Sequence, residues 1–196
     1  MLTKTYSLLH KLKSNLFFII YRRRFKNVGK KSRMYSPLKV EGMEHISIGQ
    51  NVMINNGVWL AALPLTGSNV ELTIADGVSI GHFNHIYATS SITIEKDVLT
   101  ADKVYISDNL HHYEDVEVPV IKQPVKQCNS VVIGEGAWLG ENVCIIGASV
   151  GKHSVVGANS VVTHSIPDFC VAVGCPARII KKYDFTKHAW VIVNEK

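Results

Sequence analysis

The sequence predicts an all-β protein: a parallel β-helix with an N-terminal helix and one protruding loop. The main observation is a repeat of six residues between Ile133 and Pro167, where IGEGAW, LGENVC, VGKHSV, VGANSV and VTHSIP each begin with Ile, Leu or Val. A small residue follows in four of these five hexads. A period of six fits neither an amphipathic helix nor an alternating strand. It is typical of a solenoid in which each hexad forms one flat face of a coil.

Each hexad is expected to supply a short parallel strand and a turn, so that three hexads close one triangular rung. The leading aliphatic residues would stack as an internal column, and the fifth residue, also inward, must be small or slender. Gly, Asn and Asp would supply the unusual backbone angles of the corners. Each rung would bury its faces against its neighbours, and the hexads suffice for roughly six rungs.

Composition indicates one soluble globular domain with a sizeable core. The chain has 196 residues, 46% of them hydrophobic, and a formal net charge of +5. We expect an N-terminal helical and basic segment at 1–40, a coil at 41–167 with a loop at 107–130, and an exit segment at 168–196. Four cysteines without metal-ligand spacing favour a reduced, cytoplasmic protein. The apolar stretch at 16–21 is too short to span a bilayer.

Residues 3–26 have the pattern of an amphipathic helix. Apolar residues recur at steps of three and four: Leu8, Leu9, Leu12, Leu16, Ile19 and Ile20. This stripe either packs on the body or a partner subunit, or makes a peripheral membrane contact. Packing is the preferred alternative, and the basic residues that follow the apolar patch directly are the argument for the membrane contact.

Three places depart from the six-residue frame. Residues 60–73, which contain Pro64 and Gly67, are expected to form a loop. A second break, from His112 to Ser130, is long enough to indicate a functional excursion. From Ile145 to Val150 the step is five, so either that corner is tightened or Ser149 replaces the inward residue.

These hexads resemble those of the hexapeptide-repeat acyltransferases. Within that family the chain looks like the O-acetyltransferases of O-antigen, lipopolysaccharide and capsule synthesis and the related galactoside, maltose and xenobiotic acetyltransferases. The resemblance covers about residues 40–183. It implies a left-handed β-helix, acetyl-CoA as co-substrate without a metal, a saccharide acceptor that is either free or lipid-linked, and a homotrimer with sites between subunits. No nucleic-acid partner is implied.

The second break begins with residues that suit acyl transfer. The family pattern D-x-x-H-x-Y-x-D aligns with Asp108, His111, Tyr113 and Asp115. Transfer from a thioester to an alcohol needs a base for the hydroxyl proton, and imidazole, with an ordinary pKa of ~6.5, serves this role well. We predict His111 as the general base, with His112 as its neighbour. The predicted acceptor-binding residues are His85, Tyr87, Asp108 and Tyr113.

The end of the coil carries the predicted cofactor contacts. Positions that bind coenzyme A in the family match Ala158, Thr163, His164, Arg178 and Lys181. His164 stands where the family often has lysine, and Lys181 where it often has arginine. Trp138 occupies the outward end of a hexad, where it would lie near the cofactor thiol or form a subunit contact.

Three rival functions are also compatible with the sequence. An antibiotic acetyltransferase acting on a streptogramin or chloramphenicol, or on a small sugar, would use the same chemistry. A γ-carbonic-anhydrase-like hydro-lyase would need a metal held by histidines such as His82, His85, His111 and His112. A silent scaffold would use the coil only for assembly.

Overall fold

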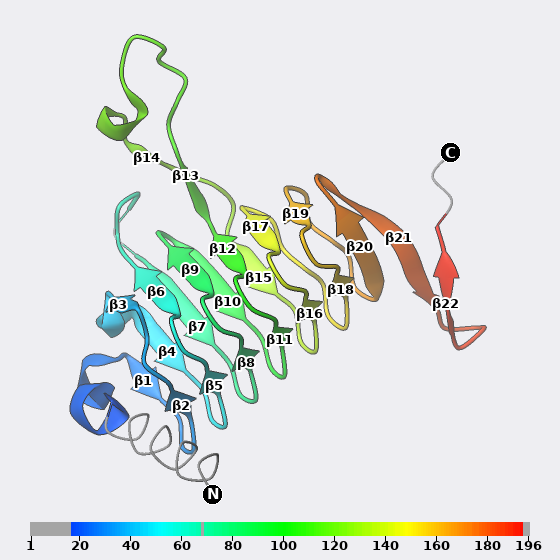
Figure 1. The fold of residues 1–196 in the computed structure, drawn as a ribbon, viewed down its shortest axis with the longest axis horizontal. Helices are drawn as coiled ribbons and strands as arrows, with labels where there is room; N and C mark the ends of the chain where they lie inside the picture. The colour runs from blue at the N-terminus through cyan, green and yellow to red at the C-terminus, as the bar shows by residue number, and fades with distance from the viewer. Residues whose placement is uncertain (1–16, 68, 194–196) are drawn as a thin grey trace, which may run out of the picture.

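The chain winds into a coil with three flat faces, each a parallel β-sheet (Figure 1). The structure, a computed structural model, describes residues 17–67 and 69–193. Face A consists of β1 (Asn27–Val28), β4 (Ile46–Ile48), β7 (Glu71–Ile74), β10 (Ser91–Ile94) and β15 (Val131–Ile133). Face C consists of β3 (Lys39–Glu41), β6 (Trp59–Ala62), β9 (His85–Ala88), β12 (Tyr105–Ser107), β17 (Cys144–Ile146) and β19 (Val161–Val162).

Face B is the longest sheet and ends in antiparallel strands. Its parallel part comprises β2 (Arg33–Met34), β5 (Met53–Ile54), β8 (Ser79–Ile80), β11 (Leu99–Thr100), β16 (Trp138–Leu139), β18 (Val155–Val156) and β20 (Cys170–Gly174). It continues antiparallel through β21 (Ala177–Asp184) and β22 (Ala189–Ile192). The six strands of face C agree with the rung number expected from the repeat.

The leading aliphatic residues form continuous internal columns. On face A, Ile48, Ile74 and Ile94 lie in register, and Ile133 follows on the next rung. All four are at most 1% exposed. Each such side chain stabilises the fold by roughly 1.5–3 kcal/mol through burial of apolar surface. The predicted column is therefore confirmed.

The corners adopt left-handed backbone angles whether or not the residue favours them. Asn51, Gly77 and Asp97 occupy one corner with positive φ, as the composition predicted. A second corner, between faces B and C, places Phe83 and Lys103 at φ 55° and 57°, which the residue types did not predict. Backbone bonds to the preceding rung hold these positions, for example from Lys103 N to the carbonyl of His82 at 2.7 Å. Stacking between rungs thus outweighs the local cost of the conformation.

The glycine at the second hexad position is required by the closeness of adjacent rungs. A Cβ on Gly134 would lie 2.5 Å from the backbone N of Lys152, and one on Gly151 would lie 2.3 Å from the N of Asp168. Both obstacles are backbone atoms, which cannot turn aside as a side chain can. The repeat therefore keeps glycine here for close approach between rungs.

The coil begins earlier than the sequence indicated. Residues 17–21 are helical and η1 (Arg22–Arg24) follows, so the helix stops before residue 26; the expected stretch at 3–16 lies outside the described residues. β1 already pairs with β4, which places rung strands inside the segment assigned to 1–40. Phe18 and Phe25 are buried under this end, with ring centroids 6.0 Å apart. They close the core at this end of the coil, where β1 and β2 are the first strands described.

The interpretation of 60–73 as a loop is wrong at both ends. Leu60 and Ala62 belong to β6, and Leu72 belongs to β7. All three are fully buried, because their side chains continue the internal columns. Only residues 63–70 leave the coil, with residue 68 outside the described part.

The short step at 145–150 is a tightened corner, the first of the two alternatives. Ala148 is the small inward residue at 2% exposure, and Val150 bridges Ile133 and Ile166. Ser149 faces outward, and its Oγ accepts a hydrogen bond from Val132 N at 2.9 Å. The serine hydroxyl thus satisfies an amide at the tightened corner.

A long arm rises from the corner between faces C and A (Figure 1). It begins as the antiparallel pair β13 (Asn109–His111) and β14 (Val125–Gln127), and its outer part contains η3 (Val120–Lys122). Another short helix, η2 (Met43–His45), precedes β4. Among the residues described, no helix is long and apolar enough to cross a membrane.

Candidate active site

The arm carries both candidate histidines at the end of β13. His111 pairs with Val125 across the two-stranded ladder, and its side chain is exposed. His112 continues the pairing, with its backbone N 3.0 Å from the carbonyl of Pro124. The hairpin fixes the backbone of both residues while their side chains stand clear of the coil.

The root of the arm is held by a buried carboxylate, Asp108. It is 0% exposed, and its Oδ2 accepts backbone hydrogen bonds from Ser90 and Ser91, each at 2.8 Å. Its Oδ1 accepts the backbone N–H of Thr89 at 2.8 Å and the side-chain amide of Asn109 at 3.0 Å. The chain leaves the coil here to form the arm, so no strand of the next rung accepts these hydrogen bonds at this corner. The carboxylate of Asp108 accepts them instead.

The prediction that Asp108 binds the acceptor is therefore wrong. Its oxygens are occupied and shielded from solvent, so it anchors the arm that carries His111. Gln127 secures the second strand of the arm, because its amide donates to the carbonyls of Asp108 (2.7 Å) and Cys128 (3.1 Å). Its Oε1 faces the hydroxyls of Thr89 and Thr66.

The two histidines differ in their surroundings. His112 Nδ1 lies 2.8 Å from Glu114 Oε2, and Lys126 Nζ lies 2.5 Å from the other oxygen of that carboxylate. The bond from Lys126 is the main reason that the pKa of Glu114 lies well below its ordinary value. Within the described residues His111 has no side-chain partner, so both of its ring nitrogens remain available. Tyr113 is 65% exposed beside them.

An aromatic row crosses the outer surface of face C. Trp59, His85 and Tyr105 occupy the same register position on three successive strands. The rings of Trp59 and His85 stack with centroids 4.2 Å apart and an interplanar angle of 9°, and Tyr105 follows at 5.3 Å from His85. Tyr87 lies 5.9 Å from His85. We call these four residues the aromatic row.

Only half of this row was predicted from the sequence. His85 and Tyr87 were expected at the site, whereas Trp59 and Tyr105 were not. One signal in the sequence could have found them. Trp59, His85 and Tyr105 each come directly before an aliphatic residue that points into the coil, namely Leu60, Ile86 and Ile106.

Burial disfavours the charged forms of His85 and Tyr87 in the aromatic row. Desolvation lowers the pKa of His85, against a weaker opposite influence of Glu41, and desolvation also raises the pKa of Tyr87. Nε2 of His85 is buried and has no hydrogen-bond partner among the described residues. Glu41 Oε2 accepts the indole N–H of Trp59 at 3.0 Å. The row is thus an aromatic surface with the Glu41 carboxylate at its edge.

The aromatic row adjoins the root of the arm. β12 pairs with β9, so that Ser107 lies opposite Tyr87. Two residues later Asn109 donates its side-chain amide to the Tyr87 carbonyl at 3.1 Å. One network therefore positions the arm and the neighbouring surface of face C.

Three predicted cofactor residues lie on face B. Trp138, Val155, Val171 and Lys181 lie opposite one another on β16, β18, β20 and β21. Because neighbouring strands are about 4.8 Å apart, Trp138 and Lys181 are separated by roughly 14 Å along this row. Arg178 lies opposite Val173 on the same strand pair. Trp138 is 48% exposed, and both cations are exposed.

The other three cofactor candidates lie at the corners. Ala158 is at the corner that joins face B to face C, between β18 and β19. Thr163 and His164 follow β19 at the corner between faces C and A, with their side chains 3.1 Å apart. This is the corner from which the arm rises. Face C separates these two residues from Trp138 and Lys181 within one chain.

The histidines of the metal-enzyme alternative lie apart in the fold. His82 is at a corner, His85 is within the aromatic row, and His111 and His112 are on the arm. In the part of the chain that the structure describes, no group of three histidine, cysteine or acidic residues could hold a metal ion.

Comparison with known proteins agrees with this geometry. Residues 130–164 match the family model described as the hexapeptide repeat of succinyl-transferase. The chain is 37% identical over 161 residues to WbbJ of Escherichia coli, whose name assigns it to O-acetyl transfer in lipopolysaccharide biosynthesis; the match covers 79% of this chain and 80% of WbbJ. The chain belongs to the hexapeptide-repeat acyltransferases. It is an acyltransferase with their left-handed parallel β-helix.

Other relatives and structural neighbours are more distant. The galactoside O-acetyltransferase of E. coli is 31% identical, over 76% of this chain and 63% of that protein. The crystal structure of AntD, an N-acyltransferase from Bacillus cereus in complex with dTDP and 3-hydroxybutyryl-CoA, superposes with a TM-score of 0.70 at 22% identity, covering 83% and 86% of the two chains. A maltose O-acetyltransferase from Clostridium difficile gives a TM-score of 0.55 at 27% identity, covering 84% and 73%.

Proposed function

We propose that this acyltransferase transfers the acetyl group of acetyl-CoA to a sugar hydroxyl in the biosynthesis of lipopolysaccharide O-antigen or capsular polysaccharide. One observation carries the proposal: the arm that bears His111 is anchored directly beside the aromatic row. The similarity to WbbJ supports the same reaction class.

In this proposal His111 is the general base. Its imidazole takes the proton of the sugar hydroxyl while that oxygen attacks the thioester carbonyl, and the released thiol leaves as coenzyme A. Acetyl-CoA supplies the activated acyl group. A positioned base contributes roughly 10²–10⁴-fold to such a reaction. We prefer His111 to His112 because His111 is the histidine that the family pattern aligns with the base.

The aromatic row would hold the acceptor. Flat neutral rings offer apolar contact to the C–H faces of a sugar, and a few polar groups at the edge fix its orientation. Tyr87 and Glu41 provide such groups beside Trp59. Tyr113, exposed on the arm, would contact the acceptor from the other side.

Face B would hold coenzyme A. The row from Trp138 to Lys181 offers an aromatic platform at one end and a cation at the other, and Arg178 adds a second cation for the phosphates. Thr163 and His164 lie across face C from that row within one chain, whereas Ala158 lies at the corner that borders face B. We therefore propose a homotrimer in which two subunits share each site.

We also propose that the acceptor is carried on a lipid. The enzyme would then work on the cytoplasmic side of the membrane and touch its surface peripherally. The concentration of positive charge at the N-terminal end of the coil supports this contact.

The test is thiol release from acetyl-CoA with candidate acceptors. Oligosaccharides of surface polysaccharides should stimulate release, whereas a streptogramin or chloramphenicol should not. His111→Gln should lower kcat by roughly 10²–10⁴-fold, and the matched variant His112→Gln should change it by less than about tenfold. A reversed order would assign the base to His112. Full activity in both variants would refute histidine base catalysis.

Trp59→Leu tests the acceptor surface separately. Loss of one aromatic contact, worth roughly 0.5–1.5 kcal/mol beyond its area, should raise the KM for the saccharide about two- to tenfold. The KM for acetyl-CoA should stay unchanged. A change confined to acetyl-CoA would contradict the assignment of face C to the acceptor.

A further inference from the structure

The N-terminal end of the coil combines strong positive charge with exposed apolar side chains. Eleven of the 21 Lys and Arg residues fall within the first 40 positions, and the first acidic residue of the chain is Glu41. Eight of the eleven are described: Arg22, Arg23, Arg24, Lys26, Lys30, Lys31, Arg33 and Lys39. Such a one-sided distribution favours an anionic partner.

Most of these cations have no acidic partner. Within the described residues, the ion pairs of this segment are Lys26 with Glu71 at 3.0 Å and Lys39 with Glu41 at 2.9 Å. The remaining six cations form none in that part of the chain. Their charge is therefore free to act on a partner outside the molecule.

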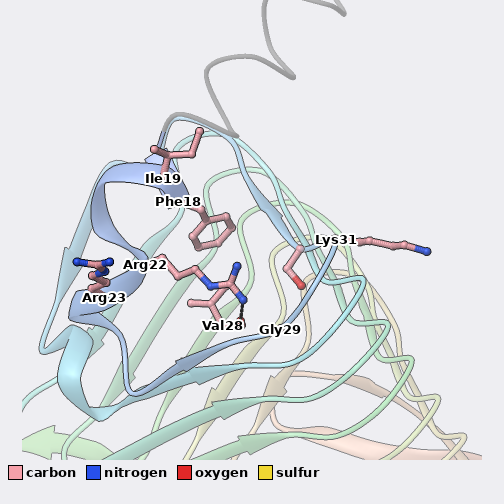
Figure 2. A pocket seen from close by; sticks show the side chains of 8 residues that line it. Phe18, Ile19, Arg22, Arg23, Val28, Gly29 and Lys31 are labelled. Carbon is pink, nitrogen blue, oxygen red and sulfur yellow. Dashed lines mark hydrogen bonds between the residues drawn. The ribbon is translucent and has the colours of Figure 1, made fainter.

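Several of the cations border a pocket of about 560 Å³ at this end (Figure 2). Its lining includes Phe18, Arg22, Arg23, Lys31 and Ser32. Arg22 donates one hydrogen bond from Nη2 to the Val28 carbonyl at 2.7 Å, drawn as a dashed line in Figure 2. That bond fixes the guanidinium, and its other donors remain available for a phosphate.

Exposed aliphatic side chains lie beside the same cations. Ile19 is 77% exposed and Ile20 is 57% exposed, and Ile19 stands at the rim of the pocket in Figure 2. Phe18, directly before them, is buried and ties this segment to the coil. Aliphatic side chains that enter a lipid interface, flanked by cations at the level of the phosphates, form the usual pattern of peripheral membrane binding.

We propose that this end of the coil docks on a membrane that contains anionic phospholipids, with Arg22, Arg23 and Lys31 holding lipid phosphates and Ile19 and Ile20 entering the interface. The inference builds on the proposed membrane contact and does not depend on the acetyl-transfer reaction. Isoleucine has no ring on which a nucleotide base could stack, which favours lipid over nucleic acid.

The position of this surface is compatible with catalysis. Figure 1 shows β1 and β2 at one end of the coil, β21 and β22 at the other, and the arm rising between them. Docking through the end would leave the arm and the aromatic row open. In a trimer, rotation about the threefold axis keeps three such ends on the same side of the assembly, so three weak contacts would act together.

The experiment measures flotation of the full-length protein with vesicles, without acetyl-CoA. We expect binding to phosphatidylcholine vesicles that contain phosphatidylglycerol, weak binding to phosphatidylcholine alone, and a decline with added salt. Replacing three cations in Arg22→Gln/Arg23→Gln/Lys31→Gln should weaken partitioning by about 100-fold or more, since each basic residue near an anionic surface contributes about 1 kcal/mol. Ile19→Ser/Ile20→Ser should also weaken it.

The matched control, Lys96→Gln/Lys103→Gln/Lys187→Gln, removes the same charge elsewhere and should bind normally. The double variant Arg23→Gln/Lys31→Gln keeps the Arg22 bond and should show an intermediate loss. The proposal would be overturned if the test and control variants lost binding equally, or if the protein bound both vesicle types equally. It would also be overturned if inorganic phosphate alone displaced the protein, or if the protein bound single-stranded RNA more tightly. Acetyl transfer to a soluble saccharide should be normal in all these variants, so failure of docking is distinguishable from failure of the proposed reaction.

Discussion

Replacing Asp108 by asparagine should loosen the arm while leaving the shape of the side chain unchanged. The carboxylate Oδ2 accepts the backbone N–H groups of Ser90 and Ser91, and Oδ1 accepts that of Thr89. Asparagine can keep its oxygen toward the N–H of Thr89. Its NH2 group would then face the N–H groups of Ser90 and Ser91, which are hydrogen-bond donors as well. Each buried N–H left without an acceptor costs about 1–3 kcal/mol. We therefore expect a loss of about 3 kcal/mol or more in the free energy of unfolding.

Urea denaturation at a fixed protein concentration measures this loss. With a urea slope of roughly 2 kcal/mol per molar, the midpoint should fall by about 1.5 M. The matched control is Asp102→Asn, because Asp102 Oδ1 accepts a single backbone bond from His82 at 2.7 Å and the amide oxygen can replace it. That variant should change stability by less than about 1 kcal/mol.

Activity provides a second measure of the Asp108 variant. Because the carboxylate anchors the arm and does not touch face B, kcat should fall while the KM for acetyl-CoA stays the same. Equal urea midpoints for the Asp108 and Asp102 variants, together with an unchanged kcat, would refute the anchoring role.

Three further predictions follow from the geometry. Gly151→Ala would place a Cβ 2.3 Å from a backbone nitrogen and should cost about 1–3 kcal/mol in thermal or urea unfolding, whereas Gly67→Ala, with nothing within 4 Å, should be nearly neutral. Burial lowers the folded-state pKa of His85, so its contribution to stability is present above pH ~6.5 and is lost as the pH falls through the lowered pKa. In His85→Phe, the free energy of unfolding should therefore differ less between about pH 5 and about pH 7.5 than in the natural protein. An identical difference in the two proteins would contradict this. Lys181→Gln should raise the KM for acetyl-CoA by about tenfold or more, as expected for loss of a charged hydrogen bond, and an equal rise in Lys187→Gln would remove Lys181 from the phosphate site.

The candidate site was predictable from the sequence only in part. The family pattern singled out His111, and His85 and Tyr87 were among the predicted acceptor-binding residues. Nothing local distinguished Asp108 as a buried anchor, because its partners Thr89 to Ser91 come from the preceding rung. Trp59 was missed for the same reason: it gains its significance from stacking on His85, 26 positions later in the chain.

By itself the sequence determined the coil. A column of aliphatic residues at every sixth position can be buried only if successive hexads turn onto one another, and the second-position glycines allow the rungs to approach. The tertiary structure decided where the coil begins, how the corner at Ala148 tightens and which groups meet at the arm. Those outcomes depend on contacts between rungs some twenty residues apart, where the backbone of one rung sets the space and the hydrogen-bond partners of the next.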